Sequence, residues 1–206
     1  MSHSDIQQKT FCTTREAAEI LGVSLRTVQL WAEAGLLEAW KTTGGHRRIM
    51  RSSMERLLTR HPPGVESTPA VDPSLIILVV EDDPELLRVC ERRMARWPMK
   101  PLVIAARNGF EALILVGLKK PDLLVTDLHM PEMDGFQMLQ QLRKMSDLAE
   151  VSIVVVTGLD AAEIEARGGI PEGIPVLPKP IPFDRLRDIA TILAARKHHQ
   201  QPRAET

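Results

Sequence analysis

Acidic, hydroxyl and ammonium side chains follow short apolar runs in the C-terminal two thirds of the chain, and their types suit phosphoryl transfer. The runs at 75–80, 123–125, 153–156 and 176–177 lead respectively to Glu81 and Asp82, to Asp127, to Thr157 and to Lys179. Short β-branched runs of this kind predict buried parallel strands. Ligands of an open parallel sheet bind beyond the carboxyl ends of its strands, so we expect these side chains to gather at one edge.

Each of these residue types has a chemical role in moving a phosphoryl group onto a carboxylate. Asp127 is the expected nucleophile. Its attack on a dianionic phosphoryl group meets charge repulsion, which a Mg²⁺ ion held through oxygen atoms of Glu81 and Asp82 would offset. Lys179 would add a fixed positive charge and Thr157 a hydroxyl donor to the phosphoryl oxygens. Gly158 has no side chain and would leave room for the group.

Strand and helix patterns alternate through this part of the chain. Strands are predicted at 75–80, 102–105, 123–125, 152–156 and near 176, and helices at 84–97, 108–118, 136–145, 161–166 and 183–195. Five βα units of this length predict an α/β fold, a doubly wound five-stranded parallel sheet of flavodoxin-like type with helices on both faces.

Composition limits the class of protein. The 206 residues are 44% hydrophobic and 26% charged, and the formal net charge is −1. No apolar run approaches the roughly 20 residues of a membrane span, and the N-terminus lacks the apolar core of a signal peptide, so no membrane partner is expected. Cys12 and Cys90 fall in different predicted domains, which favours a reducing compartment and predicts a cytoplasmic location.

The segment at 61–73 reads HPPGVESTPAVDP, and its prolines disfavour helix. We interpret it as a linker. The predicted organisation is a tail at 1–10, a small N-terminal domain at 11–60, the linker at 61–73, the α/β domain at 74–196 and a flexible tail at 197–206.

The N-terminal domain carries the signals of two short helices joined by a turn. Thr13 and Glu16 form a predicted capping box. Gly22 ends the first helix, Ser24 caps the second, and Gly35 follows the second. Two short helices joined by Gly-Val-Ser predict a helix-turn-helix, whose second helix would enter a major groove.

Two glycines among basic residues at 41–49 predict a hairpin tip, or wing, and Ser52 with Glu55 predicts a second capping box opening a short helix. Trp31 and Trp40 are interpreted as core residues. The residues predicted to contact double-stranded DNA project from the helices or lie on the wing: Arg15, Arg26, Thr27, Gln29, Lys41, Thr43, Gly45, His46, Arg47 and Arg48.

Residues 11–60 resemble the winged helix-turn-helix of the MerR and excisionase-like family through REAAEILGVSLRTVQLW, AGLLEAW and GGHRR. The resemblance implies DNA binding. MerR regulators usually continue into a long dimerising helix, and here the prolines of the linker take its place.

Residues 75–195 resemble the CheY-like receiver of bacterial two-component response regulators through ILVVEDDPELLR, LLVTDLHMPEMDGFQML, VVVTG and LPKP. The resemblance implies that a histidine kinase, a phosphotransfer protein or a small phosphodonor phosphorylates Asp127. It implies that the carbonyl oxygen of His129 joins the acidic pair as a Mg²⁺ ligand, that Thr157 is the switch hydroxyl, and that the Lys179–Pro180 bond is cis. Two features depart from the family pattern: Val176 stands where the family has its switch aromatic, and the receiver follows the DNA-binding domain.

These residues suggest three candidate functions. The first is a phosphorylation-controlled DNA-binding transcriptional regulator, not an enzyme, which forms a homo-oligomer on DNA. The second is a DNA-binding protein whose receiver is a phosphorylation-independent dimerisation or docking module, an alternative that Val176 and the weak fourth helix keep open. The third, a haloacid-dehalogenase-type enzyme, fails because His129 stands where that family places a second catalytic Asp.

Overall fold

The computed structural model describes residues 10–60, 75–144 and 151–200. The chain divides into two compact units, with the division between residues 69 and 70. The predicted linker at 61–73, most of the N-terminal tail and the final six residues lie outside the described residues, as does the predicted end of a helix at 145.

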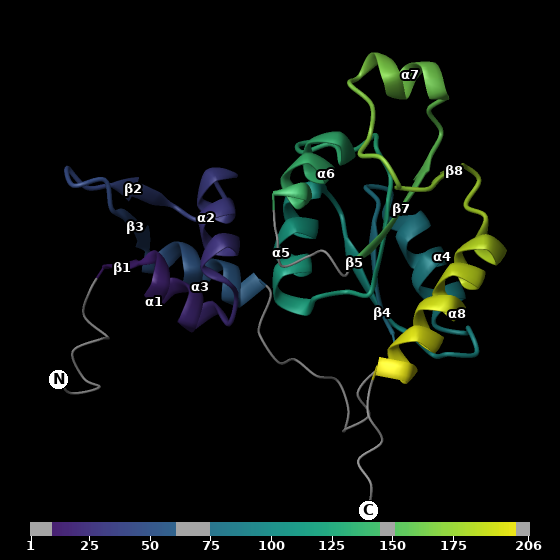
Figure 1. The fold of residues 1–206 in the computed structure, drawn as a ribbon, viewed down its shortest axis with the longest axis horizontal. Helices are drawn as coiled ribbons and strands as arrows, with labels where there is room; N and C mark the ends of the chain where they lie inside the picture. Colours follow the sequence, from purple (N-terminus) through teal and green to yellow (C-terminus); the bar gives the residue numbers. More distant parts are fainter. Residues whose placement is uncertain (1–9, 61–74, 145–150, 201–206) are drawn as a thin grey trace, which may run out of the picture. The chain divides into compact units, whose positions relative to one another are not determined.

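The N-terminal unit combines three helices with a small antiparallel sheet (Figure 1). Its elements are β1 (Phe11–Thr13), α1 (Thr14–Leu21), α2 (Leu25–Glu33), β2 (Ala39–Lys41), β3 (Arg47–Met50) and α3 (Arg51–Arg60). The strands are ordered β1-β3-β2, so the wing hairpin of β2 and β3 gains a third strand. β1 was not predicted from the sequence, because three residues are too few for a visible alternation of apolar and polar positions.

The predicted caps of the first two helices are confirmed. The Thr13 hydroxyl accepts the Glu16 N–H while the Glu16 carboxylate accepts the Thr13 N–H, which is a capping box. Gly22 ends α1 with a φ of 67°, a left-handed conformation that glycine adopts without a Cβ penalty. Ser24 then accepts the Thr27 N–H at the start of α2. These local signals fix the turn between the two helices.

Two predictions for this unit were wrong. The third helix begins at Arg51, so Ser52 lies inside it and does not cap it. The neighbouring hydroxyl of Ser53 instead donates to the Met50 carbonyl and accepts the Glu38 N–H. Trp31 is fully buried, as expected, but Trp40 is 41% exposed and meets Phe11 edge to face on the sheet. Trp40 lies on β2, an edge strand whose three residues are all exposed, so it does not reach the core.

The C-terminal unit is a five-stranded parallel sheet ordered β5-β4-β6-β7-β8, which confirms the predicted doubly wound fold. Its strands are β4 (Ile76–Val80), β5 (Leu102–Ala106), β6 (Leu123–Thr126), β7 (Ser152–Thr157) and β8 (Val176–Pro178). Its helices are α4 (Pro84–Met94), α5 (Gly109–Lys119), α6 (Gly135–Arg143), α7 (Ala161–Ala166) and α8 (Phe183–Gln200). All four strand pairings are parallel.

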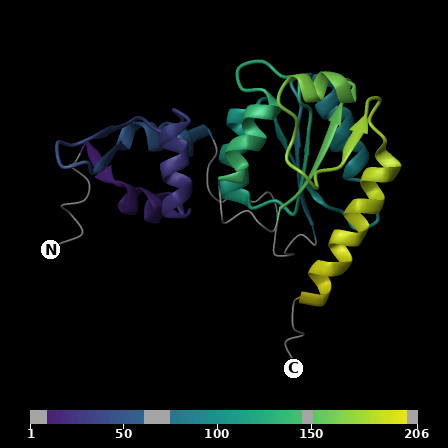
Figure 2. The same ribbon diagram turned by 45° about the horizontal axis from the view of Figure 1, so that its top comes forward.

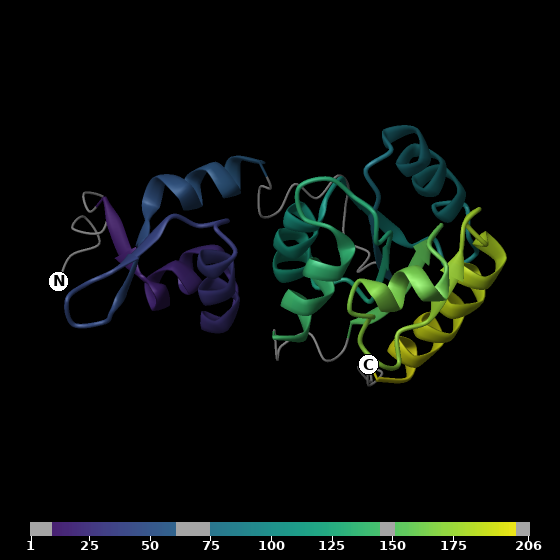
Figure 3. The same ribbon diagram turned by 90° about the horizontal axis from the view of Figure 1, so that it is seen from above.

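Helices cover both faces of this sheet (Figure 3). On one face, α4 and α8 pack against the strands through a buried apolar cluster that includes Val79, Leu87, Val125 and Leu186. On the other face lie α5 and α6, and the five residues at 112–116 of α5 are buried. Burial on both faces explains why the central strands β4, β6 and β7 read as continuous apolar runs.

The last helix is longer than predicted. Figure 2 shows α8 as the long yellow helix beside the sheet, and it continues to Gln200, past the predicted start of a flexible tail at 197. Lys197 pairs with Asp122 at 3.0 Å, and the same carboxylate oxygen of Asp122 accepts the Ile76 N–H at 2.6 Å. This ion pair attaches the end of α8 to the amino ends of two central strands, so the predicted boundary at 196 was wrong.

Candidate functional site

Three of the predicted site residues meet at the carboxyl ends of β4, β6 and β8. The Nζ atom of Lys179 lies 2.7 Å from Oε2 of Glu81 and 2.7 Å from Oδ2 of Asp127. Both carboxylates are buried, whereas Lys179 is half-buried. The ammonium group therefore bridges two acids that would otherwise repel one another.

The other carboxylate oxygen of Asp127 is held by the backbone that follows it. Oδ1 accepts the N–H groups of Leu128 and His129. The backbone around the residue is also fixed, because its N–H donates to the Val80 carbonyl at 3.1 Å and its own carbonyl accepts the Thr126 hydroxyl at 2.7 Å. Asp127 thus has one oxygen bound to backbone donors and one facing Lys179.

Burial and the ammonium group set the protonation of this cluster. Burial raises the pKa of Glu81 above its usual range, and the hydrogen bond and positive charge of Lys179 offset only part of that rise. For Lys179, burial lowers the pKa, but the bonds to Asp127 and Glu81 outweigh burial and raise the pKa overall. Lys179 is therefore a fixed cation at neutral pH.

Thr157 and Lys179 are joined through the backbone of neighbouring strands. The Lys179 N–H donates to the Thr157 carbonyl at 2.9 Å, and the buried Thr157 hydroxyl accepts the Leu159 N–H at 3.3 Å. The peptide bond between Lys179 and Pro180 is cis, as expected. A Cβ atom added at Gly158 would meet no heavy atom within 4 Å, so open space lies beside Thr157.

The donors at this edge fit Mg²⁺ by their chemistry. They are oxygen atoms, the ligands that this hard cation takes, and two of the acids are held together by Lys179. Asp82 and His129 are exposed beside them. In the described part of the chain, no three His, Cys, Asp or Glu side chains form a metal-binding group. The three acids are therefore not preassembled as a metal-binding group. Mg²⁺ at phosphate sites keeps several waters, so an ion at this edge would contact some of the acids through water.

Gly135 is a site residue that was not predicted from the sequence. A Cβ there would lie 2.3 Å from the Asp127 carbonyl oxygen and 2.8 Å from the Leu128 Cα. The Gly135 N–H donates to the Leu128 carbonyl at 3.0 Å, which folds the start of α6 back onto the segment after the candidate acceptor. The Asp-Gly pair at 134–135 was the available signal, since Asp134 caps α6.

The segment after Thr157 forms only a short helix, as expected from its weak helix signals. α7 has only six residues and is capped by a box between Asp160 and Glu163. Its C-cap residue Arg167 places its guanidinium 6.0 Å from the ring centre of Phe136 on α6. Position 176 on β8 is a valine, so the strand carries no aromatic ring there, and this side chain is 41% exposed.

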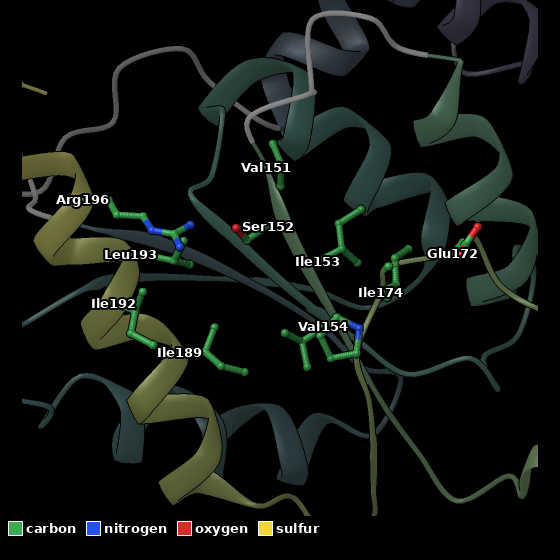
Figure 4. Close-up of a pocket in the computed structure, with 12 residues that line it drawn as sticks. Val151, Ser152, Ile153, Val154, Glu172, Ile174, Ile189, Ile192, Leu193 and Arg196 are labelled. Carbon is green, nitrogen blue, oxygen red and sulfur yellow. The ribbon is translucent and has the colours of Figure 1, made fainter.

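A separate hollow lies at the opposite end of β7 (Figure 4). Its volume is about 400 Å³, and it is lined mainly by apolar side chains of β7 and α8, among them Ile153, Val154, Ile189 and Leu193. Thr157 and Lys179 are not among its lining residues. The acidic cluster is therefore distinct from this hollow.

Most of the predicted DNA-contacting residues are accessible in the N-terminal unit. The exposed ones are Arg15, Arg26, Lys41, Thr43, Gly45 and His46, and Gln29 is half-buried. Thr27 was wrongly placed on the outer face of α2: it is 4% exposed, and its hydroxyl lies 3.0 Å from the Ser24 hydroxyl. A position three residues after an N-cap can face the cap, and here it does.

The wing is confirmed as a hairpin between β2 and β3. The Thr42 N–H donates to the His46 carbonyl at 2.9 Å, and the Gly45 N–H donates to the Thr42 carbonyl at 2.8 Å. Its two arginines have partners within the protein. Arg47 binds the Gln29 carbonyl and the Glu33 carboxylate on α2, and Arg48 donates to the Arg47 carbonyl.

Among the described helices, none is both long and apolar enough to cross a membrane.

Each of the two units matches a known family of protein domains. A family profile described as the response regulator receiver domain matches residues 77–191, and one described as a helix-turn-helix domain matches residues 11–62. These matches confirm the predicted order of the two domains.

Two relatives and one solved structure illustrate the similarity. The probable transcriptional regulator ycf27 of Porphyra purpurea is 42% identical over 83 residues, covering 40% of this chain and 32% of the relative. The DNA-binding transcriptional regulator NtrC of Salmonella typhimurium is 33% identical over 127 residues, covering 61% of this chain and 26% of the relative. The matched parts thus cover less than a third of either relative. The signal receiver domain of a DNA binding response regulator protein (merR) from Colwellia psychrerythraea superposes with a TM-score of 0.50 and 26% identity, over 59% of this chain and 98% of that one.

Proposed function

This chain belongs to the response regulator receiver domain family, and on that premise we propose that it is a phosphorylation-controlled DNA-binding regulator. The phosphoryl group is accepted on Asp127 from a histidine kinase, a phosphotransfer protein or a small phosphodonor. The observation that carries this proposal is the contact of Lys179 with Asp127 at 2.7 Å, beside buried Glu81. A buried carboxylate held beside a fixed cation suits the acceptance of a dianionic group.

The proposed step is a displacement at phosphorus. A carboxylate oxygen of Asp127 forms the new bond to phosphorus, the bond to the donor breaks, and its electron pair leaves with the donor. Lys179 then shares its charge with the phosphoryl oxygens, and the Thr157 hydroxyl, whose own hydrogen is not used by its bond from Leu159, donates to them. That donation draws Thr157 toward the acceptor and biases the segment leading to α7.

Mg²⁺ would be held by Glu81, Asp82, Asp127 and the carbonyl oxygen of His129. When bound, it would neutralise charge between the acceptor carboxylate and the incoming phosphoryl oxygens.

A gel-shift measurement tests the acceptor. The full chain is treated with acetyl phosphate and Mg²⁺ and run on a gel that retards phosphoproteins. We expect a retarded band for the wild type, none for Asp127→Asn, and a wild-type band for Asp134→Asn. Asp134 is a matched control because it is close in the chain, and asparagine replaces aspartate well as the cap of α6. A retarded band in Asp127→Asn would overturn the assignment.

The N-terminal unit is proposed to bind double-stranded DNA with α2 in the major groove and the wing beside it. One small module gives limited affinity, so two or more copies of the chain would occupy neighbouring half-sites. Phosphorylation would change that self-association. Sedimentation with and without beryllofluoride, a phosphoryl mimic, tests this regulation, because equal masses and equal DNA affinity in both states would contradict it.

One observation favours the alternative in which the receiver is a phosphorylation-independent dimerisation or docking module. Val176 stands exposed where the family uses its switch aromatic, so a threonine–aromatic coupling cannot operate here in its common form. This alternative expects a retarded band on phosphorylation, or none, with unchanged self-association. The two measurements above therefore separate the two functions.

A further inference from the structure

The base of the wing is attached to the second helix by one arginine. Arg47, the first residue of β3, places Nη1 3.1 Å from the Gln29 carbonyl and 3.3 Å from Oε1 of Glu33. Its Nη2 also lies 3.3 Å from the same Glu33 oxygen. The guanidinium therefore uses two nitrogens on two groups of α2, and its side chain is only 21% exposed.

The electrostatics of α2 explain why this contact forms. The carbonyl end of a helix carries partial negative charge, which basic residues in the last turn normally balance. The last turn of α2 contains no basic residue and ends in Glu33, which adds a full negative charge there. Arg47 supplies the missing positive charge from another element.

We propose that Glu33 is a positioning residue for DNA recognition, because it holds Arg47 and thereby fixes the wing relative to α2. This inference rests on the proposed DNA-binding function. It also reassigns Arg47, which was predicted from the sequence to contact DNA: here its guanidinium is directed to α2. Phosphate contacts of the wing then come from side chains such as exposed Lys41, for which no ion pair is found among the described residues.

The two roles of Arg47 predict opposite effects of the Glu33→Gln substitution. If Glu33 positions Arg47, its loss loosens the wing and weakens specific binding. If Arg47 contacts phosphate and Glu33 merely competes for it, the loss of Glu33 frees the guanidinium and tightens binding. The salt dependence separates the roles as well, because each phosphate contact contributes about 0.9 to the slope of log K against log salt.

The test uses the full chain and a duplex that the wild type selects from a randomised library, with a scrambled duplex for comparison. We expect Glu33→Gln and Arg47→Gln each to weaken binding to the selected duplex about three- to five-fold, as for a partly exposed ion pair. Their salt slopes and their affinity for the scrambled duplex should stay unchanged. The double variant should resemble either single variant. Lys41→Gln, by contrast, should reduce the slope by about one.

Two controls separate positioning from general damage. Arg56→Gln removes a more exposed ion pair, with Glu38 rather than α2, and is expected to leave the preference for the selected duplex unchanged. Arg47→Lys keeps the positive charge but loses the planar guanidinium, whose two nitrogens contact Gln29 and Glu33. It should therefore behave like Arg47→Gln if the geometry of this contact holds the wing.

Hydrogen exchange of the Thr42 amide in the DNA-free chain gives a readout that needs no DNA. This amide donates across the wing to the His46 carbonyl, so it should exchange faster in both Glu33→Gln and Arg47→Gln. Unchanged exchange, tighter binding of Glu33→Gln, or a reduced salt slope of Arg47→Gln would each overturn the proposal. If the wild type selects no duplex, the DNA-binding function fails, and the Thr42 exchange still decides whether Glu33 holds the wing.

Discussion

Lys179 and Asp127 follow different strands of the parallel sheet, yet Nζ of one lies 2.7 Å from Oδ2 of the other. The same Nζ atom contacts Glu81, which follows a third strand. The carboxyl ends of three strands are thereby joined by one network of charge, in which both carboxylates are buried. Removing its single cation leaves two carboxylates side by side, which burial makes costly.

We predict that Lys179→Met lowers the free energy of unfolding at pH 7 by about 1–2 kcal/mol, because two neighbouring carboxylates lose their counter-charge. Urea unfolding followed by circular dichroism measures the change. Arg88→Met is the control: its pair with Glu85 is exposed, and such pairs contribute about 0–1 kcal/mol. Equal losses in the two variants would contradict a special role for the buried pair.

Gly135 and Gly158 flank the candidate site and should respond differently to alanine. A methyl group at Gly135 meets the Asp127 carbonyl oxygen, so Gly135→Ala should cost about 1–3 kcal/mol of unfolding free energy and slow phosphorylation. At Gly158 the methyl group meets no protein atom within 4 Å, so the stability change should stay within about 0.5 kcal/mol.

Phosphorylation of Gly158→Ala tests what occupies that open space. If the phosphoryl group uses it, Gly158→Ala folds normally but accepts phosphate from acetyl phosphate more slowly than the wild type. Wild-type rates in Gly158→Ala would show that the space is not needed for the group.

The two cysteines should be unreactive in the folded protein. Burial raises the pKa of both thiols, and that of Cys90 reaches about 11. At pH 8 a thiol reagent such as Ellman's reagent should therefore react with neither residue until the chain is unfolded. Rapid reaction of the native protein would show that the interior is open to the reagent.

The raised pKa of Cys90 also predicts a loss of stability at alkaline pH. A group whose folded-state pKa is raised stabilises the fold below its ordinary value, here 9.0, and that contribution is lost as pH rises toward 11. Unfolding free energies between pH 8 and 11 should fall by about 1–2 kcal/mol more in the wild type than in Cys90→Ala. Parallel curves would contradict this linkage.

Shortening the C-terminus tests the role of Lys197. A chain ending at residue 196 loses the Lys197–Asp122 pair and the last turn of α8, so its unfolding free energy should fall by about 1 kcal/mol. A chain ending at residue 200 keeps both and should match the full chain. Equal stability of the two shortened chains would show that the pair contributes nothing.

The elements of both units were predictable where local chemistry decides them. Apolar runs marked the parallel strands most clearly at β4, β6 and β7, the central strands, whose residues are mostly buried. Thr13, Gly22 and Ser24 marked the ends of α1 and α2 because caps act within one turn. The gathering of the site residues at one edge was also predictable, because parallel strands all have their carboxyl ends at the same edge of the sheet.

Contacts between distant residues were not predictable. Arg47 on β3 binds α2, and Lys197 at the end of α8 pairs with Asp122 before β6. Thr27 was misplaced for a local reason, because its hydroxyl faces the Ser24 cap three residues earlier. Gly135 is required by the approach of the Asp127 carbonyl, which depends on how α6 returns to the sheet.

The amino-acid sequence by itself determined the two domains, which candidate site residue follows which strand, and the identity of the candidate acceptor. These follow from the spacing of hydrophobic residues, from helix caps and from residue type. Tertiary structure alone decided that Lys179 bridges Glu81 and Asp127, and that Arg47 faces α2 instead of solvent. The physical reason is that a charged side chain is satisfied by whichever partner folding brings within about 3 Å, and residues far apart in sequence carry no local signal of that distance.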